Sequence, residues 1–239
     1  MSAATVIAPG GGEVVGDAPD RRVEILSDDA SLNATWSRFA PGRDGADLHV
    51  HREHADHFFV LDGELTVRLG TDGACVAVAA GTLARIPPLV VHGFRNASDA
   101  DVRFLNLHAP GRGFADYMRG LRDGRPLAYD QHPPPPDGGR PPADAVFTGD
   151  SSAGDATVLA DLEEIAVVTL LVSSSSAPET HVHPRRVESL YVLEGELALT
   201  LGARELRAST GTWVQIPPGV PRCLSSSGRA RVLDIHTPG

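Results

Sequence analysis

Four side chains in the first half of the chain have the types and the spacing of a metal site. His49 and His51 form a His-x-His pair, and because side chains alternate between faces in an extended strand, both imidazoles project from one face. Asp56 follows where the chain has room to turn and return on a neighbouring strand, and His92 comes just after a proline-marked turn. Three imidazoles and one carboxylate are suitable ligands for Fe, Mn, Ni, Co, Cu or Zn. We therefore predict one divalent transition metal ion, held by these four residues.

Other acidic and histidine side chains lie close to this group in the sequence. Glu53 is the alternative acid if the loop geometry excludes Asp56 from the metal. His54 lies in the loop between the predicted ligands, and His57 has the opposite strand parity to Asp56. We expect both histidines to face away from the metal.

The order of these residues is similar to the two signature motifs of the cupin superfamily. The matching positions are His49, His51, Asp56 and Gly63 in the first motif, and Gly81, Pro87, His92 and Asn96 in the second. The chain departs from the family pattern at Asp56, where the family usually has Glu, and at Leu89, where it usually has Gly. The resemblance implies a double-stranded β-helix, or jelly-roll, barrel.

The same pattern returns in the second half of the chain, with one difference. The repeated positions are His181, His183, Glu188 and Gly195, followed by Gly211, Pro217 and Arg222. Arg222 replaces the histidine of the first copy, and arginine stays protonated and has no lone pair to donate to a metal. We expect Arg222 to pair with Glu188, so that the second site, made of His181, His183, Glu188 and Arg222, binds an anion, another small ligand or nothing.

Many short strand patterns separated by Gly and Pro predict an all-β protein. The one convincing helix covers Phe114 to Arg122, whose apolar stripe is typical of packing. A proline-rich segment, Tyr129 to Pro142, follows the helix and is expected to tether the two barrels. His108 and His236 occupy matching positions near the end of each copy and are expected to be structural. The predicted organisation starts with residues 1–20, a flexible N-terminal tail or a strand that pairs only in context. A cupin barrel with the metal site (21–112), the helix and linker (113–144) and a second cupin barrel with a degenerate site (145–239) follow.

Composition limits the classes of function. The net charge of -10 argues against nucleic acid or an anionic membrane as a partner. All 21 basic residues are Arg, which excludes Schiff-base chemistry because that requires a lysine amine. The sequence shows neither an apolar span nor a secretion signal, so we expect a cytoplasmic protein. It contains only two cysteines, which argues against a disulfide framework. We expect a monomer or a homodimer.

The layout is similar to that of the bicupin dioxygenases, the quercetinase-like enzymes among them. This resemblance implies a metal-dependent dioxygenase or other oxidoreductase, with Asp56 as the catalytic base. Phe58, Val60 and Phe94 are expected to make the pocket apolar, which favours a small aromatic or enol-type substrate. Two alternatives stay open: a metal-dependent isomerase, lyase or cyclase that does not use dioxygen, and a non-catalytic protein that binds a metal or small molecule.

Overall fold

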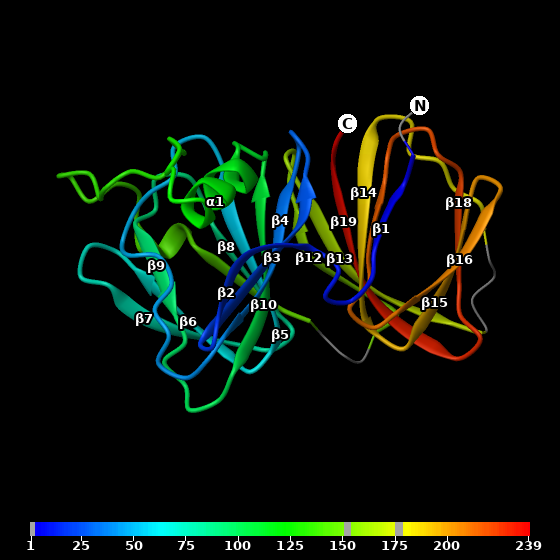
Figure 1. Ribbon diagram of the computed structural model, residues 1–239, viewed down its shortest axis with the longest axis horizontal. Coiled ribbons are helices and arrows are strands. Elements are labelled where there is room, and N and C mark those ends of the chain that lie inside the picture. Colours follow the sequence, from blue (N-terminus) through cyan, green and yellow to red (C-terminus); the bar gives the residue numbers. More distant parts are fainter. Residues whose placement is uncertain (1–2, 151–153, 175–178) are drawn as a thin grey trace. The chain divides into compact units, whose positions relative to one another are not determined.

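The computed structural model describes residues 3–150, 154–174 and 179–239. Among these residues, strands dominate and Phe114–Arg122 is the one α-helix (Figure 1). The chain divides into two compact units: Glu13–Gly149, here called the N-terminal unit, and Asp150–Gly239 together with Met1–Gly12, here called the C-terminal unit. The expected all-β fold with two barrels is confirmed.

The N-terminal unit contains a seven-stranded sheet in the order β11-β8-β5-β10-β4-β3-β2 and a three-stranded sheet in the order β7-β6-β9. Neighbouring strands in both sheets are antiparallel. Its strands are β2 (Glu13–Ala18), β3 (Arg21–Asp28), β4 (Asn33–Phe39), β5 (Ala55–Asp62), β6 (Glu64–Leu69), β7 (Ala74–Ala79), β8 (Thr82–Ile86), β9 (His92–Arg95), β10 (Val102–Ala109) and β11 (Val146–Gly149). A short 3-10 helix, Pro142–Asp144, precedes β11.

The core of the N-terminal unit lies between these two sheets. Alternation of apolar side chains directs Phe58 and Val60 of β5, and Leu65 and Val67 of β6, toward one buried cluster. All four side chains are completely buried. This packed interior fixes the strands whose ends carry the predicted metal ligands.

The C-terminal unit repeats this architecture. It has a six-stranded sheet in the order β1-β17-β14-β19-β13-β12 and a three-stranded sheet in the order β16-β15-β18. Its strands are β1 (Thr5–Ile7), β12 (Ala156–Asp161), β13 (Ala166–Ser173), β14 (Arg186–Glu194), β15 (Glu196–Leu201), β16 (Arg204–Ser209), β17 (Trp213–Ile216), β18 (Arg222–Ser225) and β19 (Arg229–Pro238).

The ends of the two units differ from the predicted boundaries. Of the two interpretations of residues 1–20, the described residues form strands that pair in context and not a flexible tail, because Thr5–Ile7 pairs with β17 and Glu13–Ala18 pairs with β3. The first two residues lie outside the described part. The strand Val146–Gly149 pairs with β8 and so belongs to the N-terminal unit. Thr5–Ile7 and Val146–Gly149 are both short and pair with segments far away in the sequence, so the alternation of apolar and polar residues within them is too weak to locate the boundaries of the units.

A motif glycine is required at the same turn in both units. Gly63 has φ of 77°, and a Cβ there would lie 2.5 Å from the carbonyl oxygen of Asp101. Gly195 has φ of 80°, and a Cβ there would lie even closer to the carbonyl oxygen of Arg229. A side chain at either position would therefore force the β5–β6 or β14–β15 turn open. Leu89, by contrast, adopts φ of 67° without being glycine, a conformation that costs roughly 1–2 kcal/mol.

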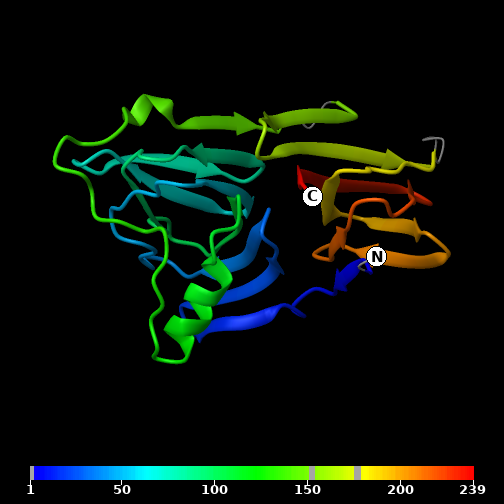
Figure 2. The same ribbon diagram turned by 90° about the horizontal axis from the view of Figure 1, so that it is seen from above.

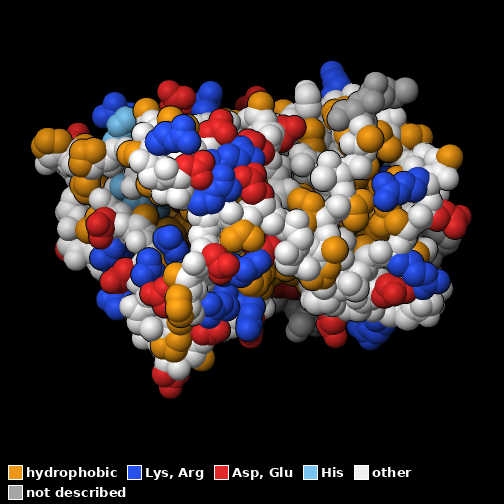
Figure 3. Space-filling model, in the orientation of Figure 1, with side chains coloured by type: hydrophobic (Ala, Val, Ile, Leu, Met, Phe, Trp, Pro, Cys, Tyr) orange, Lys and Arg blue, Asp and Glu red, His pale blue; other side chains and the backbone are white. Residues whose placement is uncertain are grey.

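The predicted helix is confirmed as α1 (Phe114–Arg122). It packs against β2 and β3 of the seven-stranded sheet (Figure 2). Arg119 and Arg122 on its outer side pair with Glu13, and acidic and basic side chains interleave over the helix (Figure 3). Among the described residues, no helix is both long enough and apolar enough to cross a bilayer.

Candidate metal centre

The predicted ligands of the first copy come together at one end of the N-terminal unit. His49 and His92 form an isolated bridge, in which each backbone N–H donates to the other residue's carbonyl oxygen at 2.8 and 2.9 Å. His51 lies on the same face as His49, and Asp56, the second residue of β5, lies beside them. The ligand atoms of His49, His51, Asp56 and His92 all lie within 4.8 Å of one another, and all four residues are buried.

The hydrogen bonds of the three imidazoles determine where their lone pairs point. The Nδ1 atoms of His49 and His92 contact the carbonyl oxygens of Asp47 at 2.6 Å and Val90 at 2.9 Å. His51 makes the equivalent contact with the carbonyl oxygen of Asp130. Because a carbonyl oxygen only accepts, each Nδ1 must carry the proton, and each neutral imidazole therefore directs an Nε2 lone pair into the site.

These converging lone pairs match the requirements of a cation. The Nε2 atoms of His49 and His51 are 3.1 Å apart, although neither can donate to the other when both rings are neutral. Asp56 Oδ1 is buried and forms no hydrogen bond within the described part of the chain. The facing lone pairs of the imidazoles and the carboxylate repel one another, and a bound cation or an extra proton would remove this repulsion. The buried His/Asp groups could hold a metal ion.

The pKa values reflect the same crowding. Burial, together with His92 and His51, lowers the pKa of His49 to about 3. Burial also opposes protonation of His51, but the adjacent Asp56 carboxylate outweighs burial and raises the pKa of His51. For Asp56, burial would raise the pKa, yet the surrounding imidazoles outweigh it and lower the pKa well below its ordinary value. Asp56 is therefore a carboxylate at neutral pH, as a metal ligand must be.

His54, which we expected to face away from the metal, and His108, which we expected to be structural, both border Asp56. His54 Nε2 lies 3.6 Å and His108 Nε2 lies 3.4 Å from Asp56 Oδ1, so both expectations are wrong. His108 stands directly opposite Asp56 in the register of β10 and β5, and opposed residues of neighbouring strands share a face. The C-terminal unit places His236 opposite Glu188 in the same way. The repeated histidine near the end of each copy was therefore a usable signal.

Tyr129 joins these two histidines into one hydrogen-bonded chain. Its hydroxyl lies 2.7 Å from His54 Nε2 and 2.5 Å from His108 Nδ1, while His54 Nδ1 lies 3.0 Å from the Asp130 carboxylate. Since the carboxylate only accepts, His54 donates to Asp130, the Tyr129 hydroxyl donates to His54, and His108 donates to the Tyr129 oxygen. The remaining lone pair of His108, on Nε2, then faces Asp56.

The proline-rich segment was expected to connect the two barrels, but it lies within the N-terminal unit, between α1 and β11. The Asp130 carboxylate accepts hydrogen bonds from the backbone N–H groups of Arg52 at 3.0 Å and Glu53 at 2.7 Å. His132 pairs through its backbone with Val50, between the two ligand histidines. This segment therefore holds the loop that carries His49 and His51, a long-range role that its composition did not indicate.

The remaining candidates lie away from the site. Glu53, the alternative acid, pairs with Arg112 and has a side chain 61% exposed. His57 is buried but belongs to none of the groups of possible metal-binding side chains found among the described residues. The motif residue Asn96 has a structural role, because its amide donates to the carbonyl oxygens of Phe39 and Ala100.

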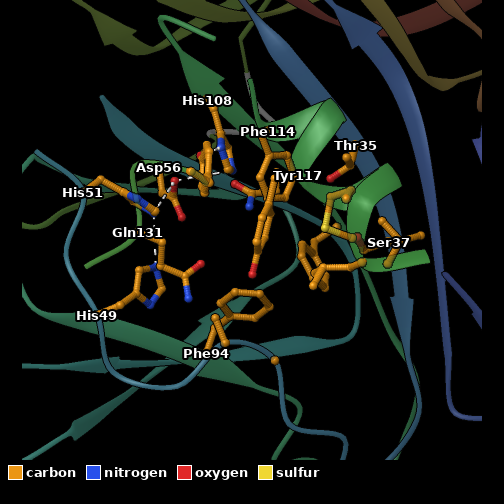
Figure 4. A pocket seen from close by; sticks show the side chains of 18 of the residues that line it. Thr35, Ser37, His49, His51, Asp56, Phe94, His108, Phe114, Tyr117 and Gln131 are labelled. Atoms are coloured by element: carbon orange, nitrogen blue, oxygen red, sulfur yellow. Dashed lines mark hydrogen bonds and ion pairs between the residues drawn. The ribbon is translucent and has the colours of Figure 1, made fainter. Parts of the chain in front are cut away.

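A cavity of about 310 Å³ opens beside the metal-binding group. Figure 4 shows His49, His51 and Asp56 at one end, and Thr35 and Ser37 at the other. The apolar stripe of α1 forms one wall, so its role extends beyond the expected packing. Phe94 borders the cavity as expected, whereas Phe58 and Val60 lie in the core and do not. The aromatic and apolar lining residues are Val23, Phe39, Phe94, Phe104, Phe114, Tyr117, Met118, Leu121 and Tyr129.

The corresponding place in the C-terminal unit is occupied by an ion pair. The Arg222 guanidinium contacts the Glu188 carboxylate through Nε, as expected, and lies 2.8 Å from His183 Nε2 through Nη2. Both Glu188 and Arg222 are buried. His181 lies outside this group, with a side chain 54% exposed. The guanidinium is already matched by a carboxylate, so this arrangement does not favour the expected anion site.

Comparison with known proteins agrees with this geometry. The family model described as "Cupin domain" matches residues 35–108 and again residues 166–236. The chain belongs to the cupin family. A search of curated proteins gives no match.

Solved cupin-like structures resemble the chain over nearly its full length. Protein Ylba from E. coli has a TM-score of 0.72 at 14% identity, covering 99% of this chain and 90% of that one. Oxalate decarboxylase from Lactobacillus farciminis, in a formate complex, has a TM-score of 0.69 at 14% identity and covers 99% and 87%. AerE from Microcystis aeruginosa has a TM-score of 0.65 at 14% identity and covers 97% and 98%. At these identities the likeness establishes the two-domain cupin fold alone.

Proposed function

We propose that this cupin is a metal-dependent enzyme whose single metal centre is formed by His49, His51, Asp56 and His92. The observation that carries the proposal is the convergence of three Nε2 lone pairs and one carboxylate in a buried site. Because Arg222 occupies the matching position in the C-terminal unit and pairs with Glu188, we expect one working site per chain.

The reaction that we favour is oxidation of a small aromatic or enol-type substrate by dioxygen. When bound, the metal supplies Lewis acidity toward an enol or phenol oxygen and allows dioxygen to react. Asp56 accepts the substrate hydroxyl proton at Oδ1, the carboxylate oxygen that has no hydrogen-bond partner in the described structure. The aromatic wall formed by Phe94, Phe114 and Tyr117 binds the flat part of the substrate and excludes water.

A second candidate is a lyase or isomerase reaction that needs no dioxygen. The observation that favours it is the chain of hydrogen bonds from His108 through Tyr129 and His54 to Asp130, beside Asp56. Such a chain suits repeated proton transfer. One fold neighbour is named as an oxalate decarboxylase, which is a lyase. Turnover that is unchanged when air is removed would favour this candidate.

Elemental analysis of untagged protein tests the proposal first. We expect about one transition metal ion per chain. The variant His92→Ala should lose this ion, because one of its four ligands is removed. The matched variant His183→Ala alters the equivalent motif of the C-terminal unit and is expected to keep the metal. Oxygen uptake with flavonols and diketones then separates the two reactions. Loss of half of the metal in His183→Ala would contradict the assignment of a single site.

A further inference from the structure

Arg21 borders the cavity beside the metal centre and has no ion-pair partner among the residues that the structure describes. It lines the cavity, and its Nε atom is buried without any hydrogen bond. Within the described part of the chain, its side chain forms neither a hydrogen bond nor an ion pair. Its neighbour on the strand, Arg22, differs in pairing with Glu24 at 2.6 Å. A partly desolvated guanidinium that contacts no acid is costly unless a ligand supplies one.

The charges around Arg21 leave it available to an anion. The nearby acid, Asp20, is already paired with Arg43 at 2.9 Å. Burial and the like charge of Arg43 lower the pKa of Arg21 and outweigh the attraction of Asp20, which raises it, although a guanidinium stays protonated at neutral pH. The two acids that line the cavity are Asp56, in the metal-binding group, and the solvent-exposed Asp47.

A track of polar side chains connects Arg21 with the metal-binding end. The strand register places Asn106 opposite Thr35, and Ser37 opposite Val23, so these residues share the inner face of the sheet. Thr35, Ser37 and Asn106 are buried and line the cavity, and the Asn106 Oδ1 atom has no hydrogen-bond partner in the described structure. Buried polar groups at successive interior positions are unusual for a core and are typical of a ligand site.

The position of Arg21 sets the length of the ligand. Arg21 is on β3 and Asp56 is on β5, and the sheet order β5-β10-β4-β3 puts three strand spacings between them. Three spacings of about 4.8 Å give roughly 14 Å across the strands. The register adds an offset along them, because Arg21 aligns through Phe39 with Val102 of β10, whereas Asp56 aligns with His108 near the other end of the same strand. A molecule that reaches both ends must therefore be elongated. α1 lies along its path with Phe114, Tyr117 and Met118, which favour a flat apolar middle.

We propose that Arg21 binds the carboxylate of an elongated organic acid whose other end reaches the metal centre, with Thr35, Ser37 and Asn106 contacting polar groups between. This inference rests on the proposed function for the identity of the metal end. It restricts the substrate class to elongated aromatic or enol-type carboxylates. One guanidinium is sufficient for one carboxylate, which it can bind with two parallel hydrogen bonds.

The test compares two probes of nearly the same shape, trans-cinnamate and cinnamamide, which differ in charge. Dissociation constants are measured by calorimetry on the wild-type protein, on Arg21→Gln and on Arg22→Gln. We expect the wild type to prefer the acid about tenfold, as a charge-assisted hydrogen bond provides. Since the protein carries a net charge of -10, general electrostatics opposes this preference. In Arg21→Gln the two probes should bind with about equal dissociation constants. Arg22→Gln, whose altered side chain lies on the opposite face of the strand, should keep the preference for cinnamate.

Either of two results would overturn the inference: a wild-type protein that fails to prefer cinnamate, including one that binds neither probe, or a preference that survives in Arg21→Gln. Neither probe carries an enol or catechol group, so the comparison does not depend on turnover. Metal content is measured on the same samples and should be equal in all three. Absence of metal together with an intact preference would contradict the proposed function and leave the Arg21 site standing.

Discussion

Asp130 is a single residue that connects the proline-rich segment to the metal-binding loop. Its carboxylate accepts hydrogen bonds from the backbone of Arg52 and Glu53 and from His54, and it also contacts His132 Nε2 at 3.1 Å. Its carbonyl oxygen accepts the hydrogen bond that orients His51. Groups that orient a metal ligand from behind affect metal affinity almost as strongly as the ligand itself. Asp130 is therefore a positioning residue for the metal centre.

Replacing Asp130 with Ala should weaken metal binding roughly tenfold, because the loop loses its anchor while all four ligands remain. Competition with a chelator measures this change. Asp137→Ala, an exposed position of the same proline-rich segment, is the matched control and should bind metal as the wild type does. Equal affinities in the two variants would show that the Asp130 contacts do not hold the site.

At the scale of the elements, Asp150 forms hydrogen bonds with two neighbouring strands of the C-terminal unit, β13 and β19. Its carboxylate accepts hydrogen bonds from Arg231 of β19 at 2.6 and 2.8 Å and from Thr169 of β13 at 2.7 Å. Burial raises the pKa of Asp150, but the hydrogen bonds from Arg231 and Thr169 outweigh burial and lower it below 3.8. A carboxyl group whose folded pKa is lowered stabilises the fold above its unfolded pKa and loses that effect as the pH falls.

Asp150→Asn should reduce the free energy of unfolding by about 1–2 kcal/mol at neutral pH. The difference from wild type should shrink as the pH falls below about 4, where the unfolded carboxyl group takes up a proton. Urea denaturation at several pH values measures it. Asp155→Asn, at an exposed position nearby, should have little effect at any pH. A difference that stays constant down to about pH 2 would refute the assigned role.

At the scale of the whole molecule, each unit is completed by a strand that local patterns assign elsewhere. The N-terminal unit ends with β11 on the edge of β8, while β1 completes the C-terminal unit on the edge of β17. An uncovered strand edge offers unpaired N–H and C=O groups to other chains. The effective folding units therefore follow the strand pairing rather than the limits of the sequence repeat.

Two fragments test this division. Residues 13–149 contain β2, β11 and the four proposed metal ligands His49, His51, Asp56 and His92, so this fragment should be monodisperse and bind about one metal ion. Residues 21–144 follow the predicted limits and lack both strands, so β3 and β8 become open edges and the fragment should aggregate. Size-exclusion chromatography and elemental analysis compare them. Equal behaviour would mean that the outer strands contribute little.

Much of the fold could be predicted because it depends on local patterns. Alternating strands, turn glycines such as Gly63 and the apolar stripe of α1 each leave a signal within a few residues. The internal repeat then indicated two barrels, and Arg222 at the position of His92 indicated a changed second site because its charge is a property of the residue itself. The spacing of His49, His51, Asp56 and His92 in the sequence identified them as candidate metal ligands.

Tertiary structure decided the features that depend on pairing between distant segments. His54 and His108 border Asp56 because of a loop path and a strand register, and Asp130 reaches the site from a segment far along the chain. Arg21 borders the cavity because β3 joins the same sheet as β5. Sequence alone determined which side chains could bind a metal and where they repeat. Only folding decided which other side chains surround them, because those contacts form between residues that share no local pattern.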